Sequence, residues 1–179
     1  CCEVPLGGTI IDFLGSQPPA SRLFNRHWNF ICRLLAEVLE GLAFLKSVNV
    51  VHAGLSGHSI MLDGDRSAKL FMPKLLEEYR ELSAKNAYMA PETRETGEMS
   101  FPADIFAFGI LITECLFATA AEDIFDETRT SDFRINVDGV KSALKAKDCP
   151  KHCEDLLQLA VLCCQKDAAC RPEADDMTE

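Results

Sequence analysis

The sequence predicts a mainly α-helical domain with a few short β-strands, and three stretches of the chain support this prediction. Residues 100–117 are apolar on nearly every side, and a helix that is apolar all round has to be buried. Residues 22–48 and 154–165 repeat apolar side chains at helical spacing. We therefore expect several helices packed around one buried central helix.

The central helix has a clear predicted start. Ser100 can accept a hydrogen bond from the first turn, and Pro102 stands where a missing N–H costs nothing. The stretch is shorter than the ~20 uncharged residues that cross a bilayer, and it contains Asp104 and Glu114. These charges favour a core helix over a membrane span.

The elements before the central helix are shorter, apart from the long helix at 22–48. Thr9 is expected to cap a short helix that follows a glycine turn. Two short apolar runs, 48–51 and 59–62, predict small strands. The second run is followed by a tight turn and a partner strand at 68–71, which together predict a hairpin.

Two stretches have no clear assignment. Residues 74–86 are charged and fit either one irregular helix or a mobile segment. Residues 118–142 are poorly patterned, so no element is assigned there.

Composition excludes two classes of partner. The 179 residues include 18 basic and 28 acidic side chains, which give a formal net charge of −10. Such a chain repels phosphate backbones and anionic lipid, so nucleic-acid binding and polybasic membrane binding are disfavoured. The length and the 47% of hydrophobic residues fit one globular domain over residues 1–179.

The nine cysteines predict reduced thiols. Their number is odd, several lie inside helical patterns and no secretory signal is visible, so a cytoplasmic protein is favoured over a disulfide framework. The alternative is a zinc site around Cys149, His152, Cys153 and 163–164, but this spacing is not that of a zinc finger or ribbon. The chain begins at Cys1 and not at Met, so we expect it to be a piece of a longer one.

Several short motifs follow one another in a fixed order. They are His52-Ala53-Gly54-Leu55-Ser56-Gly57-His58-Ser59, Ala90-Pro91-Glu92, Asp104-Ile105-Phe106-Ala107-Phe108-Gly109 and Arg171-Pro172. This order resembles the C-terminal lobe of a protein kinase, whose signatures are H-R-D-L-x-x-x-N, D-F-G and A-P-E. Glu3 with the following glycines resembles the hinge strand. The resemblance implies a C-lobe alone, from the hinge to the start of the last helix, with the N-lobe absent.

The end of the chain narrows the resemblance. It contains Ser131-Asp132-Phe133-Arg134-Ile135-Asn136-Val137, then Cys149-Pro150, and then Leu162-Cys163-Cys164 leading to Arg171-Pro172. These motifs are similar to the end of LIM kinases and of their testis-specific kinase relatives, in the tyrosine-kinase-like branch. The activity implied by the family is protein Ser/Thr or dual-specificity kinase activity.

By the resemblance, the positions that carry the catalytic side chains for phosphoryl transfer in the family hold other residue types in this sequence, which lack the required functional groups. The family uses an Asp as proton acceptor, and an Asn and the D-F-G Asp as Mg²⁺ ligands. These positions fall on Gly54, Ser59 and Met72. Glycine has no side chain, and a thioether does not replace an oxygen ligand of a hard cation. No catalytic residue or metal ligand is therefore expected to be intact.

The positions that hold the fold together are kept. His52 is expected to be a packing residue, and Asp104 to accept N–H bonds from the His52 loop. Glu92 and Arg171 correspond to the ion pair that ties the activation segment to the last helices in the family. Glu3 and Met61 fall on the hinge and pocket positions at which the family binds its nucleotide.

Three functions stay open at this point. The first is a degenerate kinase-like domain, a pseudokinase, which needs no cofactor and acts as a scaffold or regulator by contacting an active kinase or a cytoskeletal regulator. The family context for it is actin-regulatory signalling. The second is a fragment of a LIM-kinase-like enzyme that binds ATP and Mg²⁺ and phosphorylates proteins, which requires a glycine-rich loop and a strand Lys upstream. The third is a truncated kinase remnant without function.

Overall fold

The computed structural model describes residues 8–16, 20–71, 87–121, 123–124, 128–146 and 153–177. The elements in chain order are α1 (Ile10–Gly15), α2 (Ala20–Ser47), β1 (Ile60–Leu62), β2 (Ala68–Leu70), α4 (Pro91–Thr96), α5 (Phe101–Phe117), α7 (Val137–Ala146), α8 (Cys153–Cys163), and the 3-10 helices η2 (Ala168–Cys170) and η3 (Asp175–Met177). The mainly helical fold with two short strands confirms the predicted fold class. The expected element at 74–86 lies outside the described residues.

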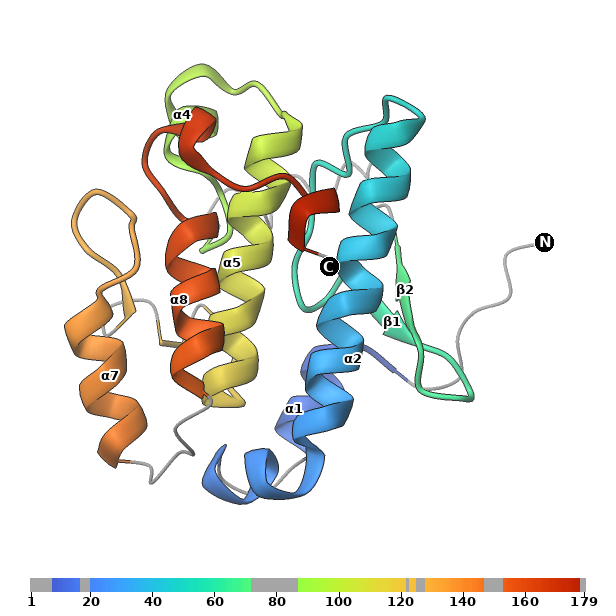
Figure 1. Ribbon diagram of the computed structural model, residues 1–179, viewed down its shortest axis with the longest axis vertical. Coiled ribbons are helices and arrows are strands. Elements are labelled where there is room, and N and C mark those ends of the chain that lie inside the picture. Colours follow the sequence, from blue (N-terminus) through green and yellow to red (C-terminus); the bar gives the residue numbers. More distant parts are fainter. Residues whose placement is uncertain are drawn as a thin grey trace.

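Helix α5 is the centre of the fold, between α8 on one side and α2 on the other (Figure 1). Every residue from Ala103 to Phe117 is buried, as the all-apolar pattern predicted. The Ser100 side chain accepts a hydrogen bond from Ala103 N and caps the helix at its predicted start. The buried helix therefore fixes the position of whatever its first turn holds.

Helix α8 packs closely along α5. A Cβ placed on Gly109 of α5 would lie 2.6 Å from the sulfur of Cys164 and 2.8 Å from Cβ of Cys163. Such distances are too short for a real contact, so the absence of a side chain at Gly109 is what allows the two helices to approach. The sequence placed α8 correctly, within two residues at each end.

Helix α2 ends differently from the prediction. Residues 48–51 were expected to form a strand, but none is present there, because the chain closes the end of α2 instead. Asn49 adopts a left-handed conformation with φ of 56°. Its N–H donates to Lys46 O, and the N–H of Val50 donates to Leu45 O. These bonds satisfy carbonyls at the helix end, which a strand would leave without partners.

The predicted hairpin is present. Strands β1 and β2 are antiparallel, with Ile60 opposite Leu70 and Leu62 opposite Ala68. The loop before α1 reaches this hairpin through an isolated bridge between Thr9 and Met61. Thr9 and Asp12 also form a reciprocal capping box at the start of α1, which confirms the predicted cap.

Two helices were not predicted. Helix α4 is only six residues long, and it begins at Pro91 and ends before Gly97, whose φ is 74°. Helix α7 lies in the stretch that carried no clear pattern, and it contains Gly139, an unfavourable residue in a helix. Within the part of the chain that the structure describes, no helix is long and apolar enough to cross a membrane.

Candidate functional site

The loop from His52 to Ser59 is held by the first turn of α5. The Asp104 carboxylate accepts hydrogen bonds from the backbone N–H of His52 at 2.8 Å and of Ala53 at 2.9 Å. Ala53 is held at φ of 61°, a conformation that costs energy for any residue other than glycine. Both oxygens of Asp104 are thus engaged with the backbone of this loop.

Ser59 is committed to the structure of the loop. Its side chain is fully buried. The Ser59 hydroxyl accepts from Ser56 N at 2.9 Å and donates to Ser56 O at 2.9 Å. Its own carbonyl accepts from Phe71 N at 2.8 Å. The Ser59 hydroxyl therefore uses both its donor and its acceptor to close a local turn.

A small cavity of about 30 Å³ lies beside Gly54. Residues from the loop, from the segment before α4 and from α5 line it, among them Gly54, Leu55, Met89, Met99, Ala103 and Asp104. The volume suits about one water molecule. With no side chain at Gly54 and with the Asp104 oxygens already bonded, this cavity contains no carboxylate set up to accept a proton from a substrate.

The outer face of the hairpin carries Met61 and Phe71. Side chains alternate along a strand, so Met61, Lys69 and Phe71 point away from the face that packs Leu70 against α2. Met61 is partly buried, and Phe71 is 48% exposed. Glu3 and Met72, the other positions expected at this site, lie outside the described residues.

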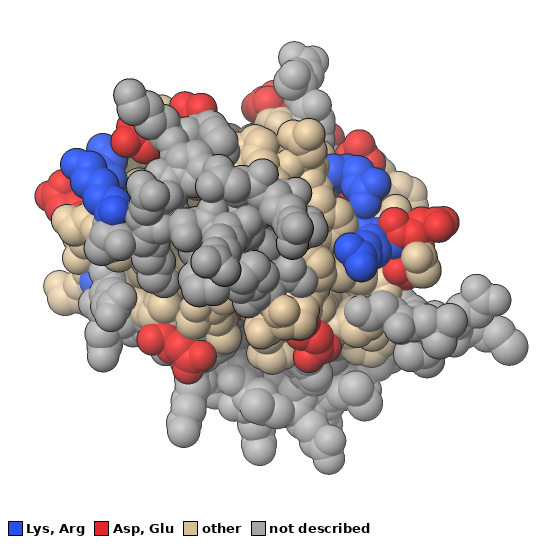
Figure 2. Space-filling view, turned by 90° about the horizontal axis from the view of Figure 1, so that it is seen from below, with Lys and Arg blue, Asp and Glu red and all other residues tan. Residues whose placement is uncertain are grey.

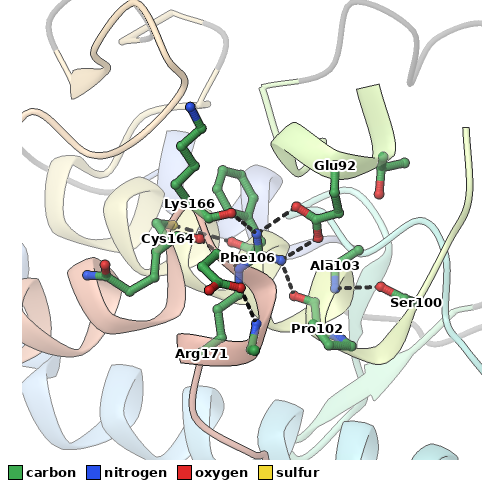
Figure 3. A network of polar contacts seen from close by, with 12 residues as sticks. Glu92, Ser100, Pro102, Ala103, Phe106, Cys164, Lys166 and Arg171 are labelled. Atoms are coloured by element: carbon green, nitrogen blue, oxygen red, sulfur yellow. Dashed lines mark hydrogen bonds and ion pairs between the residues drawn. The ribbon is translucent and has the colours of Figure 1, made fainter. Parts of the chain in front are cut away.

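The Glu92 and Arg171 side chains form a bidentate ion pair (Figure 3). Arg171 Nη1 lies 2.6 Å from Glu92 Oε1, and Nη2 lies 2.7 Å from Oε2. The guanidinium also donates to the carbonyls of Pro102 at 2.8 Å and Gln165 at 2.9 Å. The Arg171 side chain is 1% exposed, so this charge is desolvated and its donors are used in several directions. The pair joins α4 to the first turn of α5 and to the turn after α8.

The buried thiols belong to the core. Burial raises the pKa of Cys164 to about 12, and burial also raises the pKa of Cys115 and of Cys163. Cys149 and His152 of the zinc hypothesis lie outside the described residues. Among the residues that are described, no three His, Cys, Asp or Glu side chains gather in a way that could hold a metal ion.

Surface charge is mixed on the face seen in Figure 2. The described Lys and Arg side chains gather at separate places toward its two edges, and acidic side chains lie beside them. Lys46 near the end of α2 also pairs with an acidic side chain, that of Glu173, and such exposed pairs neutralise charge locally.

Tyr88 is a residue of this site that the sequence analysis did not assign a role. It is 3% exposed, and its hydroxyl oxygen accepts a hydrogen bond from Gly57 N at 3.0 Å. Arg129 was missed as well, although its Nη2 donates to Ala87 O at 2.5 Å. The position of Tyr88 just before Ala90-Pro91-Glu92 was the one signal available for it, and no pattern marked Arg129.

The helical fold, the anchored loop and the Glu92–Arg171 pair together fit a protein-kinase-like fold. The family model described as protein tyrosine and serine/threonine kinase matches residues 3–179, so the chain belongs to this family. Among curated proteins it is similar to dual specificity testis-specific protein kinase 1. It is 28% identical to that of Rattus norvegicus and 27% identical to those of Mus musculus and Homo sapiens, over 97% of this chain. The chain spans only 28% of the length of these relatives.

The described residues do not fit the magnesium–nucleotide complex that the family binds. Mg²⁺ requires oxygen ligands in octahedral geometry. At this loop Gly54 offers none, the Ser59 hydroxyl is bonded to Ser56, and the Asp104 oxygens are bonded to backbone N–H groups. The loop therefore lacks a preformed oxygen site.

Proposed function

We propose that this chain is a catalytically degenerate protein-kinase-like domain that acts by binding other proteins, as a scaffold or regulator. The observation that carries the proposal is the state of the loop between His52 and Ser59. Its backbone is anchored by Asp104, but the positions that the resemblance assigns to the base and to the Asn metal ligand are occupied by Gly54 and Ser59. Loss of a general base alone typically costs about 10²–10⁴ in rate.

The metal deficit is separate from the base deficit. In the family the metal ions bridge the phosphate oxygens and neutralise the charge that develops in transfer, which is usually the largest contribution to catalysis. Here Ser59 stands at the position of the Asn ligand and Met72 at that of the D-F-G Asp, by the sequence resemblance. The Ser59 hydroxyl already accepts a hydrogen bond from Ser56 N and donates one to Ser56 O. It could bind a cation only if these hydrogen bonds were broken.

A role in binding other proteins is compatible with the structural interactions that the chain retains. The ion pair between Glu92 and Arg171 and the anchor at Asp104 preserve a folded lobe with a fixed surface. Domains of one fold commonly host different functions, so a lobe of this kind can keep its contacts with proteins after its chemistry is lost. By family context, the partner class is an active protein kinase or a regulator of the actin cytoskeleton, and the location is the cytoplasm.

The second candidate is an active protein kinase of which this chain is part. Membership of the kinase family favours it, as does the similarity to proteins named dual specificity testis-specific protein kinase 1. This candidate requires ATP and Mg²⁺ to bind, and it requires another group to take over the role that the family assigns to the position of Gly54.

Two measurements on the same preparation distinguish the candidates. Thermal unfolding is followed with ATP, with Mg²⁺ and with both, and transfer of labelled phosphate from ATP to a mixed protein substrate is measured in parallel. The proposal predicts no metal-dependent stabilisation by ATP and no transfer. The variant Gly54→Leu fills the cavity beside the loop, so transfer that persists in this variant comes from a contaminating kinase. Metal-dependent stabilisation together with transfer that Gly54→Leu abolishes would establish the second candidate.

A further inference from the structure

Two arginines hold the backbone on either side of Tyr88. Arg129 Nη2 donates to the carbonyl of Ala87 at 2.5 Å, and Arg94 Nε donates to the carbonyl of Met89 at 3.3 Å. Arg94 comes from α4, whereas Arg129 comes from the loop that precedes α7. The three-residue segment is therefore held by side chains from two separate parts of the chain.

Both arginines also contact Phe133. Arg129 Nη1 donates to the Phe133 carbonyl at 3.0 Å, and the Arg94 guanidinium lies 4.2 Å from the centre of the Phe133 ring. A guanidinium at this distance over an aromatic face is attracted by it. One residue thus positions both guanidinium groups, one through its backbone and one through its ring.

The loop that carries Phe133 has a defined backbone. Phe133 itself is held at φ of 66°, and its N–H donates to Thr130 O at 3.0 Å. An isolated bridge pairs Arg129 with Ile135 across the loop. A bulky residue at positive φ persists only where its surroundings impose it, so the position of the Phe133 carbonyl is set by the loop.

Tyr88 transmits the position of this segment to the loop beside Gly54. Its hydroxyl oxygen accepts from Gly57 N at 3.0 Å, in a buried contact. Gly57 has little room to move, because a Cβ placed there would lie 2.5 Å from Ile11 Cδ1 and 2.6 Å from Glu114 Oε2. A displacement of Tyr88 therefore has to break its bond with Gly57.

Burial of Arg129 is difficult to explain by stability alone. The residue is 7% exposed, and burial lowers the pKa of its guanidinium. A buried charge is often no more stabilising than an apolar side chain of similar volume. A methionine would fill the same space, but it would give no directed donors to Ala87 and Phe133. The directed donors are what the arginine adds.

We propose that Arg129 and Arg94, braced on Phe133, are positioning residues that set the segment 87–89 and, through Tyr88, the Gly57 end of the loop beside Gly54. The cavity wall and the loop at 129–135 then move as one unit. A protein bound at the 129–135 loop therefore alters the cavity beside Gly54. This use by a partner rests on the proposed binding function, whereas the brace itself does not.

The test is the hydrogen exchange rate of the Gly57 amide, measured by NMR on the whole chain, because this amide reports the contact with Tyr88 directly. Arg129→Met is compared with wild type and with Arg134→Met, a matched change at the exposed, ion-paired arginine of the same loop. We expect exchange at Gly57 to become about tenfold faster in Arg129→Met, with no change at the α5 amides of Ile110 and Leu111. Arg134→Met should leave all three rates as in wild type.

Two outcomes overturn the proposal. Unchanged exchange at Gly57 in a folded Arg129→Met variant would show that no coupling exists. Equal acceleration at Gly57 and at the α5 amides would show that Arg129 only stabilises the fold as a whole. Neither readout involves nucleotide or phosphate, so the result is independent of the test of the proposed function.

A second pair of variants keeps the test decisive if Arg129→Met does not fold. Phe133→Gly retains the positive φ and removes the ring under Arg94, and we expect a smaller acceleration at Gly57, about threefold. Tyr88→Phe removes the acceptor of the Gly57 N–H and should give the full acceleration without touching either arginine. If Tyr88→Phe accelerates exchange and Phe133→Gly does not, Tyr88 contacts Gly57 independently of the brace and the proposal is wrong.

Discussion

The region around Arg171 and the loop from His52 to Ser59 lie at the same end of α5, yet they differ in what their polar groups do. At Arg171 a charged donor finds a carboxylate and several carbonyls, which links three segments of the chain. At the loop the only carboxylate of the first α5 turn, Asp104, is used on backbone N–H groups, and the Ser59 hydroxyl is used on Ser56. In one region the polar side chains form a buried ion pair, and in the other they form hydrogen bonds within or to the loop backbone.

This difference indicates which requirements still act on the chain. Arg171, Glu92 and Asp104 all have partners within the fold, whereas the loop position next to the cavity is occupied by Gly54, which has no side chain. A chain in which all polar chemistry were decaying would lose the buried ion pair as readily, because a half-removed pair leaves a desolvated charge. The contrast is what a folded binding domain requires.

The largest expected effect on stability comes from removing the Arg171 side chain. Arg171→Ala leaves Glu92 without its partner and several carbonyls without a donor, so we expect a loss of about 3–5 kcal/mol in the free energy of unfolding, measured by chemical denaturation. Lys46→Ala is the matched control, since Lys46 also pairs with a carboxylate, that of Glu173, but in solvent, and it should cost much less stability than Arg171→Ala. Equal effects of the two variants would contradict the assigned importance of the buried pair.

The buried thiols make the scaffold sensitive to alkaline pH. The pKa of Cys164 is raised to about 12 by burial, so its thiol stays neutral in the folded state while the unfolded chain ionises near pH 8.5. A raised folded pKa gives stability that is complete below the unfolded pKa and is lost as pH rises toward the folded one. We expect Cys164 to contribute a loss of about 2 kcal/mol between pH 8 and pH 10.

Denaturation of wild type and Cys164→Ala at both pH values isolates this contribution. The difference in stability between the two proteins should shrink by that amount on going from pH 8 to pH 10. A constant difference across this range would show that the Cys164 thiol is not protected in the folded state.

A moderate effect is expected at Ser59 on the loop side. Ser59→Ala removes both hydrogen bonds with Ser56 from a buried position, so the variant should lose about 1–2 kcal/mol in unfolding free energy. Ser47→Ala removes a comparable hydroxyl contact, to Phe44 O, at an exposed position and should be nearly neutral. If Ser59→Ala is neutral as well, the hydroxyl is not structural and remains available to a ligand.

The smallest effect is expected at Ala53. Glycine at this position would relieve the cost of φ at 61°, against which the greater entropy of glycine in the unfolded chain has to be set. We expect Ala53→Gly to stabilise the protein by about 0.5 kcal/mol in thermal or chemical unfolding. A clear destabilisation would mean that the Ala53 methyl group contributes packing beside the cavity that outweighs the strain.

The sequence predicted those elements whose signals are local. The Ser100 cap, the Pro102 start and the all-apolar run defined α5, and Thr9 defined the start of α1. The strand expected at 48–51 was wrong because β-branched residues favour strands, while the competing signal, Asn49 as a helix terminator, is a single residue. Helix α4 was missed since six residues are too few to show a period.

Only those residues of the candidate site that belong to recognisable sequence motifs could be predicted. Motif order singled out Asp104, Glu92 and Arg171, and in the structure Asp104 accepts from the His52 N–H and Glu92 pairs with Arg171. The internal bonds of Ser59 depend on the turn geometry of the loop, which residue types alone do not determine. The contact of Arg129 with Ala87 joins residues 42 positions apart, and no periodic pattern encodes a pair at that separation.

The most direct test of the proposed loss of the metal site uses Mn²⁺ as a paramagnetic substitute for Mg²⁺, since the two ions accept similar oxygen ligands. Electron paramagnetic resonance of Mn²⁺ with a non-hydrolysable ATP analogue is recorded with and without the protein. The account predicts that the spectrum of the Mn²⁺–nucleotide complex does not change when the protein is added. A bound signal of one Mn²⁺ per chain, which Gly54→Leu removes, would contradict it.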